Sequence, residues 1–122
     1  MGTTYDIHED IKHAGLELID AGRLADDCKE PWWNQSLARV NDSVARLGVF
    51  HGEFHWHKHD REDELFFVLE GTLLLDIEGR PTAELKARQG MVVPRGVVHR
   101  TRAPSRTVVL MVEAASVKPT GD

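Results

Sequence analysis

Short apolar runs alternate with short polar breaks along most of the chain. The apolar runs predict strands at residues 36–40, 44–50, 54–59, 65–69, 72–77, 82–87, 91–93, 97–102 and 107–113. Turn-forming residues separate them, for example Asn41-Asp42, and Ala103-Pro104-Ser105 predicts a turn between the last two strands. Many short strands at this spacing are typical of a sandwich or barrel. We therefore predict an all-β fold, an antiparallel jelly-roll β-barrel, which removes most free strand edges.

The chain of 122 residues is predicted to form a single domain, 1–122. Residues 1–30 are the most polar and are expected to form a short N-terminal arm, helical or extended. Residues 31–113 hold the predicted barrel, and residues 114–122 are expected to form an extended, mobile tail. A domain of this size buries enough surface to be stable without disulfides or metal staples.

Within the arm, residues 5–13 predict one short helix or a frayed segment, 16–19 a short strand, and 24–28 a helical turn. The arm is followed by Trp32 and Trp33, which form an aromatic wall near a pocket, an oligomer contact, or a plug on the barrel. Several predicted strands are apolar on both faces, which suits strands whose outer face is also covered. A homodimer is therefore expected.

Charge and cysteine content narrow the class of protein. The formal net charge is −5, and the basic residues are scattered, which disfavours nucleic acid or an anionic membrane as a partner. The single Cys28 excludes an internal disulfide and favours a reducing compartment, so we expect a cytoplasmic protein. The first ten residues lack the basic and apolar regions of a signal peptide, and no apolar run approaches the roughly 20 residues of a membrane helix.

The densest group of candidate functional residues lies between residues 52 and 71. His57 and His59 are two apart, so in a strand their side chains point to the same face, with His55 on the same parity. A polar turn then returns the chain to a second strand that opens with Glu64. Two neutral imidazoles and a carboxylate suit a divalent transition ion such as Fe, Mn, Zn, Ni or Co.

A fourth candidate ligand lies far downstream. His99 follows the turn at Pro94-Arg95-Gly96, and closure of the barrel would direct it into the interior that holds the other three. His55 is the ambiguous residue, because its parity allows a fifth ligand, a general base or a donor behind the ligands, but also a simple wall position. It is the one candidate catalytic residue.

These residues resemble the two motifs of the cupin superfamily. His57-Lys58-His59, four residues, Glu64, six residues and Gly71 match the ligand part of the first motif, and Pro94-Arg95-Gly96, two residues and His99 match the second. The chain looks most like small single-domain bacterial cupins of the cupin 2 type, often labelled mannose-6-phosphate-isomerase-like. The resemblance implies that His57, His59, Glu64 and His99 bind one divalent metal ion.

The sequence departs from the family pattern at three positions, none of which supplies a ligand. Gly52 stands one residue too close to the first histidine, Gly90 stands only four positions before Pro94, and Ala103 replaces the closing asparagine. These changes affect the turns around the site.

Two functional classes follow from such a site. The first is a metalloenzyme that acts on a small organic molecule, by dioxygenase-type oxidation or by metal-assisted isomerisation or lysis. The second is a non-catalytic cupin that binds or senses a small molecule. The sequence favours the enzyme slightly and does not specify a substrate.

Overall fold

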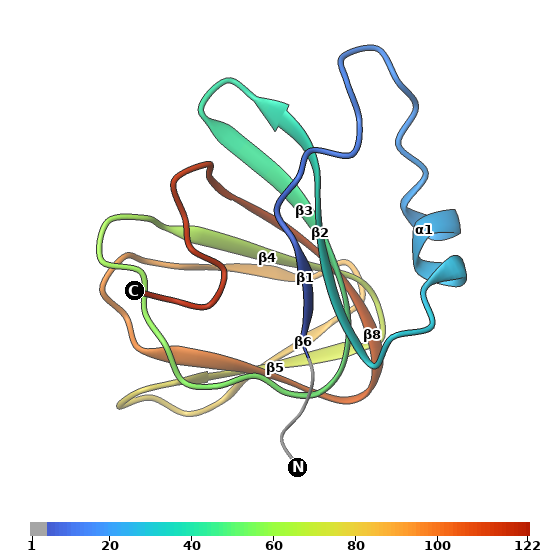
Figure 1. The fold of residues 1–122 in the computed structure, drawn as a ribbon. Coiled ribbons are helices and arrows are strands. Elements are labelled where there is room, and N and C mark those ends of the chain that lie inside the picture. Colours follow the sequence, from blue (N-terminus) through green and yellow to red (C-terminus); the bar gives the residue numbers. More distant parts are fainter. Residues whose placement is uncertain (1–4) are drawn as a thin grey trace.

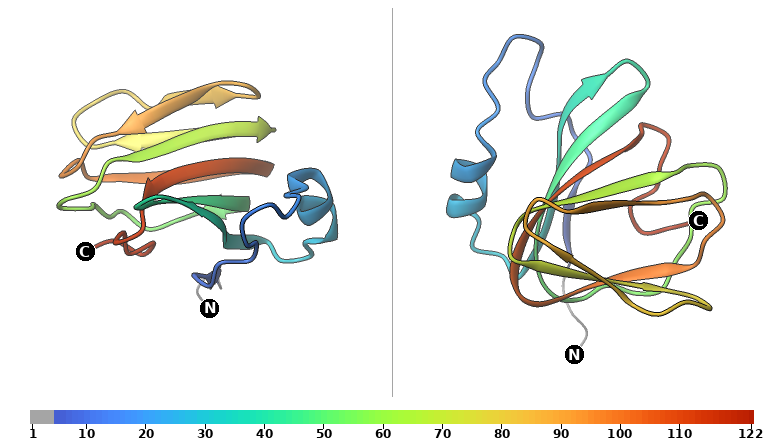
Figure 2. Two further views of the ribbon diagram at one scale, coloured as in Figure 1. Left: turned by 90° about the horizontal axis from the view of Figure 1, so that it is seen from above. Right: turned by 180° about the vertical axis from the view of Figure 1, so that it is seen from behind.

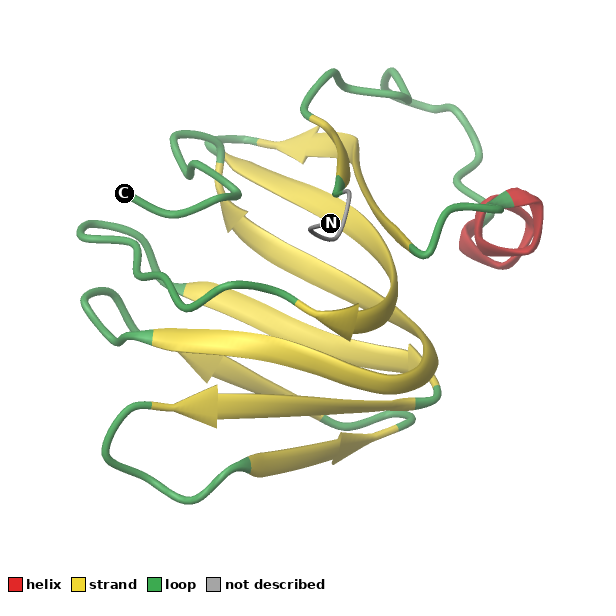
Figure 3. Ribbon diagram, turned by 60° about the horizontal axis from the view of Figure 1, so that its bottom comes forward, coloured by secondary structure: helices red, strands yellow, loops and turns green. Residues whose placement is uncertain are grey.

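Eight strands form most of the ordered framework within the described residues, 5–122, of the computed structural model (Figure 1). Their bounds are β1 Asp6–His8, β2 Trp32–Val40, β3 Ser43–Glu53, β4 Glu64–Glu70, β5 Thr72–Ile77, β6 Ala83–Lys86, β7 Gly90–Val93 and β8 His99–Ala114. The sheet order is β1-β2-β3-β8-β4-β7, and β5 pairs with both β6 and β8. All pairs except the parallel β1 and β2 are antiparallel. The sheet curls into a roll, which confirms the predicted jelly roll (Figure 3).

The inward face of the roll carries the larger hydrophobic core. Trp32 stacks on Phe50 and Phe54, with ring centroids 4.1 and 5.4 Å apart. Burial of apolar surface of this kind is the main stabilising contribution to folding. The buried members of this core are Trp32, Phe50, Phe54, Phe66, Val68, Leu73, Leu75, Leu85, Val93, Ala103, Val109 and Met111.

A second, smaller core lies on the outer face of β2 and β3, beneath the helix α1 (Ala21–Asp27). The helix begins after Asp20, whose side chain accepts a hydrogen bond from the Arg23 amide at 3.0 Å, a typical N-cap. Its Ala25 is fully buried and packs with Leu37, Leu47, Val49 and Val108. Figure 2 shows α1 outside the roll. The predicted helical turn at 24–28 is therefore confirmed.

Residues 1–4 of the arm lie outside the described residues. In the rest of the arm, the structure differs from the prediction at residues 5–13 and at residues 16–19. Residues 5–13 do not form a helix. Instead, β1 pairs with the free edge of β2, and this backbone pairing overrides the helical spacing of the apolar residues. Residues 16–19 do not form a strand, because Leu16 has a φ of 68° and no neighbouring strand pairs with this stretch.

The predicted turn at Ala103-Pro104-Ser105 is wrong, because β8 runs through it. The first half of β8 pairs with β5, whereas residues 108–113 pair with β4, and β3 pairs with β8 on both sides of this point. The exposed Pro104 lies at this change of partner, where a strand tolerates a residue without an amide hydrogen. One strand therefore crosses the whole length of the barrel.

The predicted strand at 54–59 is only partly present. After β3, this segment runs beside β8, and Phe54 donates a backbone hydrogen bond to Thr101 at 3.0 Å. His57 and His99 then form an isolated bridge in which each amide donates to the other carbonyl at 2.9 Å. Regular pairing is absent from this stretch of the described chain, yet the bridge fixes the two histidines opposite each other.

Residues 115–122, here called the closing segment, do not extend away from the barrel as predicted. The Ala115 amide donates to Asp42 at 2.9 Å, Val117 is buried, and the Asp122 amide donates to Lys58 at 3.0 Å. Figure 1 shows this segment folding back across the end of the roll. Among the described residues, no helix has the length and apolar character needed to cross a bilayer.

A buried ion-pair network ties β5 to β8 on the outer face of the barrel. Asp76 accepts hydrogen bonds from Arg100 at 2.7 Å, from Arg102 at 2.5 and 2.8 Å, and from the Thr82 hydroxyl at 2.6 Å. The hydrogen bonds from Arg102, more than any other contact, hold the pKa of Asp76 well below its usual range. The network therefore stabilises the fold while Asp76 is ionised.

We expect Asp76→Asn to lower the free energy of unfolding by about 2 kcal/mol at pH 7, the usual scale for a hydrogen bond to a charged group. The pKa of Asp76 is lower in the folded chain than the unfolded value of about 3.9. The stabilisation is therefore present above that value and is lost as pH falls through the folded pKa. Urea unfolding at pH 7 and at strongly acidic pH measures it; an equal gap between wild type and variant at both pH values would contradict this assignment.

Candidate metal centre

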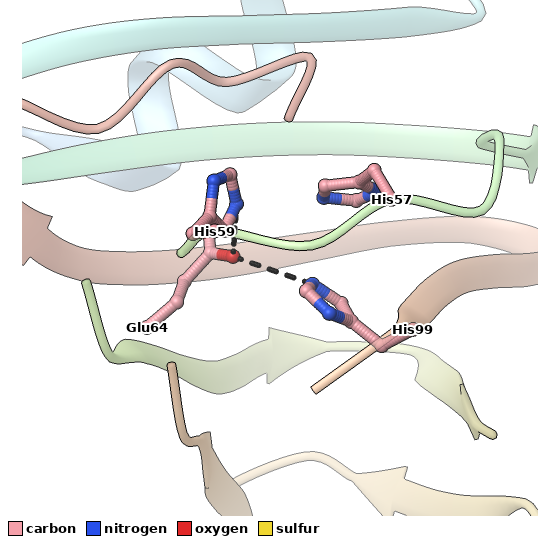
Figure 4. Close-up of side chains that lie close together, drawn as sticks. All are labelled: His57, His59, Glu64 and His99. Atoms are coloured by element: carbon pink, nitrogen blue, oxygen red, sulfur yellow. Dashed lines mark ion pairs between the residues drawn. The ribbon is translucent and has the colours of Figure 1, made fainter. Parts of the chain in front are cut away.

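Four side chains from three separate segments converge inside the barrel (Figure 4). His57 and His59 come from the segment beside β8, Glu64 begins β4, and His99 begins β8. Each offers one ligand atom, and these atoms lie within 4.8 Å of one another. The four residues that the sequence singled out are therefore brought to one point.

Backbone carbonyls fix the orientation of two of the imidazoles. The Nδ1 of His57 lies 3.0 Å from the His55 carbonyl, and the Nδ1 of His99 lies 2.9 Å from the Val97 carbonyl. A carbonyl oxygen only accepts, so Nδ1 carries the hydrogen in both rings. The lone pair is then on Nε2, which is the arrangement found in metal-binding histidines whose other nitrogen donates to a carbonyl.

Several of the converging atoms lack a partner. Within residues 5–122, no hydrogen-bond partner is present for the buried Nδ1 and Nε2 of His59, Nε2 of His99 and Oε1 of Glu64. Oε1 of Glu64 lies 3.4 Å from Nε2 of His59 and 3.7 Å from Nε2 of His99. Unsatisfied buried polar atoms are costly and rare, and an ion bound between them is one recognised reason for them. A divalent cation fits this group of donors.

The protonation states suit a cation. Burial lowers the pKa of His57 to about 4, so its imidazole is neutral at physiological pH. Burial alone would raise the pKa of Glu64, but the adjacent His59, His99 and Glu113 outweigh it and hold the pKa below its usual range. At His59 burial lowers the pKa, but the adjacent Glu64 outweighs it and raises the pKa. The centre therefore offers a neutral nitrogen at His57, further imidazole nitrogens and one carboxylate, and zinc and related ions accept imidazole and carboxylate donors.

A buried polar group behind Glu64 was not foreseen from the sequence. Glu64 and Glu113 are register partners in β4 and β8, and both are buried. Nε of the buried Arg46 lies 3.5 Å from Glu113 and donates to Asn34 at 2.8 Å. Burial and the adjacent Glu64 raise the pKa of Glu113, so only one of these two carboxyl groups is ionised.

A signal for this group was present in the sequence. Arg46 is a lone charge inside the apolar run 44–50, and Glu113 ends the apolar run 107–113. A single charge within an otherwise apolar strand indicates a buried, paired side chain. The pairing of these charges depends on the register of the strands, and the sequence does not reveal that register.

His55, the candidate catalytic residue, does not join the four. Its Nε2 lies 2.7 Å from the carbonyl of Thr120 in the closing segment, and its ring stacks on Phe54. We expect His55→Ala to retain one equivalent of metal, because the side chain contacts no candidate ligand atom. Elemental analysis measures this, with His51→Ala, an exposed histidine, as the matched control; complete loss of metal in His55→Ala alone would make His55 a ligand.

A small cavity adjoins the four side chains. Its volume is about 20 Å³. His57 and Glu64 line it, together with Trp32, Asn34, Phe50, Phe54, Phe66, Thr101, Met111 and Pro119. Of the two tryptophans that the sequence singled out, Trp32 lines this cavity, whereas Trp33 packs against the second core on the outer face. A concave, largely apolar space with a few polar groups is the usual form of a small-molecule site.

Comparisons with known proteins agree with this fold and site. A family model described as "Cupin domain" matches residues 48–113. The chain is 51% identical over 90 residues to "Uncharacterized protein YdbB" from Bacillus subtilis (strain 168), which covers 74% of this chain and 80% of that protein.

Solved structures share the fold. A cupin-2 domain containing protein from Shewanella frigidimarina superposes with a TM-score of 0.74 at 30% identity, covering 80% of this chain and 94% of that one. Protein NMB1881 from Neisseria meningitidis gives a TM-score of 0.72 at 24% identity, covering 80% of this chain and 99% of that one, and supports the fold alone. A jelly roll with a histidine and glutamate cluster inside it defines a cupin. This chain belongs to the cupin family, because the matched region, residues 48–113, spans more than half of its 122 residues.

Proposed function

We propose that this protein is a metal-dependent cupin enzyme that acts on a small organic molecule. His57, His59, Glu64 and His99 would hold one divalent transition ion, Fe, Mn, Zn, Ni or Co. The observation that carries the proposal is the group of buried donor atoms that face one another without partners among the described residues. The backbone carbonyls that accept from Nδ1 of His57 and His99 leave the lone pair of each ring on Nε2, and this also supports the proposal.

The chemistry follows from an incomplete coordination shell. Four protein ligands leave one or two positions open on a five- or six-coordinate ion, so the ion would supply Lewis-acid polarisation or, if redox-active, oxygen chemistry. The chain's own residues would do the rest. Trp32, Phe54 and Phe66 exclude water from the space beside the ligands, while Asn34 and Thr101 offer hydrogen bonds that orient a bound molecule.

A non-catalytic binding or sensing role is the second candidate. One observation favours it: apart from the candidate ligands, the polar side chains that line the cavity are Asn34 and Thr101. Neither is an acid or base near neutral pH. A reaction that needs a separate proton donor would therefore lack one in this cavity.

Metal analysis of protein purified without added metal tests the proposal. We expect about one equivalent of a transition ion for each chain, and uptake of O2 with candidate substrates if the ion is iron or manganese. Purified protein that neither contains nor binds any divalent transition ion would contradict the metal centre. Stoichiometric zinc or nickel with binding but no turnover would favour the second candidate.

We also propose that residues 1–122 act as one cupin domain, with residues 1–30 as its arm, 31–113 as its barrel and 114–122 as its tail.

Exposed apolar side chains support a homodimer; they are Ile11, Leu16, Leu18, Ile19, Val40, Trp56 and Val92. Light scattering after gel filtration measures the assembly, and a monomer at micromolar concentration would contradict it. The free Cys28 supports a reducing, cytoplasmic location.

A further inference from the structure

The closing segment, residues 115–122, forms one wall of the cavity beside the candidate ligands. Pro119 lines the cavity directly. Gly121 lies so close to His57 that a Cβ built on it would come within 2.5 Å of the His57 Cβ. Its φ is +94°, a conformation that side chains other than glycine's rarely adopt. The segment therefore depends on this glycine to lie against the histidine.

The contacts of this wall converge on the stretch that carries two candidate ligands. The Thr120 carbonyl accepts from His55 at 2.7 Å, and the Asp122 amide donates to Lys58 at 3.0 Å. The Asp122 carboxylate accepts from the Asp60 amide at 2.7 Å. The segment thus covers His57 and His59 from outside the barrel.

The other walls of the cavity are strands of the barrel and the stretch with Phe54 and His57 that bridges to β8, whereas this one is a short segment anchored near its middle. Val117 is buried, but Lys118, Thr120 and Asp122 are exposed. Breaking a few exposed hydrogen bonds and one apolar contact would move the segment without unpairing any strand. Local openings of this kind have the lowest free energies in a fold.

The cavity beside this wall is too small for an organic molecule. Its volume of about 20 Å³ corresponds to roughly one water molecule. Admission of even a small carboxylic acid therefore requires a wall to move, and the closing segment is the wall that is held least.

We propose that the closing segment is a movable wall whose residues Pro119 and Gly121 determine the size of the molecule that reaches the candidate ligands. This inference rests on the proposed function in that the admitted molecule would bind beside the metal. In the closed position the site admits water and ions of a few atoms. In the open position it admits organic molecules, which Pro119 then contacts.

Chemical modification of metal-free protein tests the wall directly. Diethyl pyrocarbonate, which is far larger than the closed cavity, modifies neutral imidazoles, and mass spectrometry follows His57 against the exposed His51 as an internal standard. Gly121→Ala places a side chain against His57 in a left-handed conformation and should favour the open position. We expect modification of His57 to become roughly tenfold faster.

Two further variants separate movement of the wall from local disturbance of His57. Val117→Ser weakens the buried anchor without touching His57, and it should also accelerate modification at His57. Gly79→Ala is the matched control, because Gly79 also has a positive φ, +78°, but an added Cβ meets nothing within 4 Å. Gly79→Ala should leave the rate unchanged.

The outcomes are distinct. Acceleration in both Gly121→Ala and Val117→Ser supports the movable wall. Acceleration in Gly121→Ala alone, in neither variant, or equally in Gly79→Ala overturns it. Cobalt(II) uptake, followed by its visible absorption, tests the proposed function separately: failure of uptake alongside accelerated modification would remove the metal centre and leave the wall in place.

Discussion

His57→Ala is expected to abolish stoichiometric metal binding. The substitution removes one of four donors, and the remaining three cannot complete the shell. Substitution of a residue that hydrogen-bonds to a metal ligand typically lowers metal affinity about 10- to 100-fold. Loss of a ligand itself should therefore lower metal affinity by more than roughly 100-fold. Metal content by elemental analysis and affinity by competition with a chelator measure the effect.

The same substitution should remove the stabilisation that metal gives to the folded chain. Wild type should unfold at a higher temperature with metal than without it, because the ion binds the folded state alone. His57→Ala should show no such difference, whereas the exposed control His51→Ala should behave as wild type. Unchanged metal content in His57→Ala would remove this residue from the ligand set.

The second large effect is expected at Arg46, which lies within the barrel behind Glu64. Arg46→Met should lower the free energy of unfolding by about 3 kcal/mol, because it leaves Asn34 buried without its donor and Glu113 buried without the adjacent guanidinium. Urea unfolding of metal-free protein measures this, since metal binding would otherwise add its own contribution.

A double variant shows whether the loss comes from stranded polar groups. Arg46→Met with Glu113→Leu replaces both partners by apolar side chains, and such replacement is often nearly neutral. We expect it to recover more than half of the loss seen in Arg46→Met alone. The single variants Arg46→Met and Glu113→Leu complete the comparison. If the double variant loses as much free energy of unfolding as the two single variants together, the two side chains do not interact, and the contact at 3.5 Å contributes nothing.

The fold was predictable where the signal is local. The apolar runs give strands β4 to β7 closely, because each is a short run bounded by turn residues. Pairing between distant segments was not predictable: β1 forms on the edge of β2, and Pro104 lies within β8, since each depends on which strand lies alongside. The closing segment follows the same rule, because its contacts are to residues more than fifty positions earlier.

The candidate ligands were predictable for a different reason. Strand periodicity places His57 and His59 together, and the turns before Glu64 and His99 bring these two residues toward them. The resemblance to known motifs then implies that all four bind a metal. The group behind them was not predictable, because Arg46 and Glu113 meet only through the register of β3, β4 and β8. A lone charge in an apolar run signals burial at each residue, but it does not identify the partner.

The alternation along β8 has a consequence for how this protein can change. His99, Thr101, Met111 and Glu113 all have odd numbers and all point inward, so one strand supplies a candidate ligand, part of the cavity and the carboxyl group beside Glu64. Insertion of one residue within either half of β8 would reverse the faces of the residues between the insertion and the next bend. We therefore expect length variation among natural variants to fall in the hairpins, and change within this strand to occur by substitution.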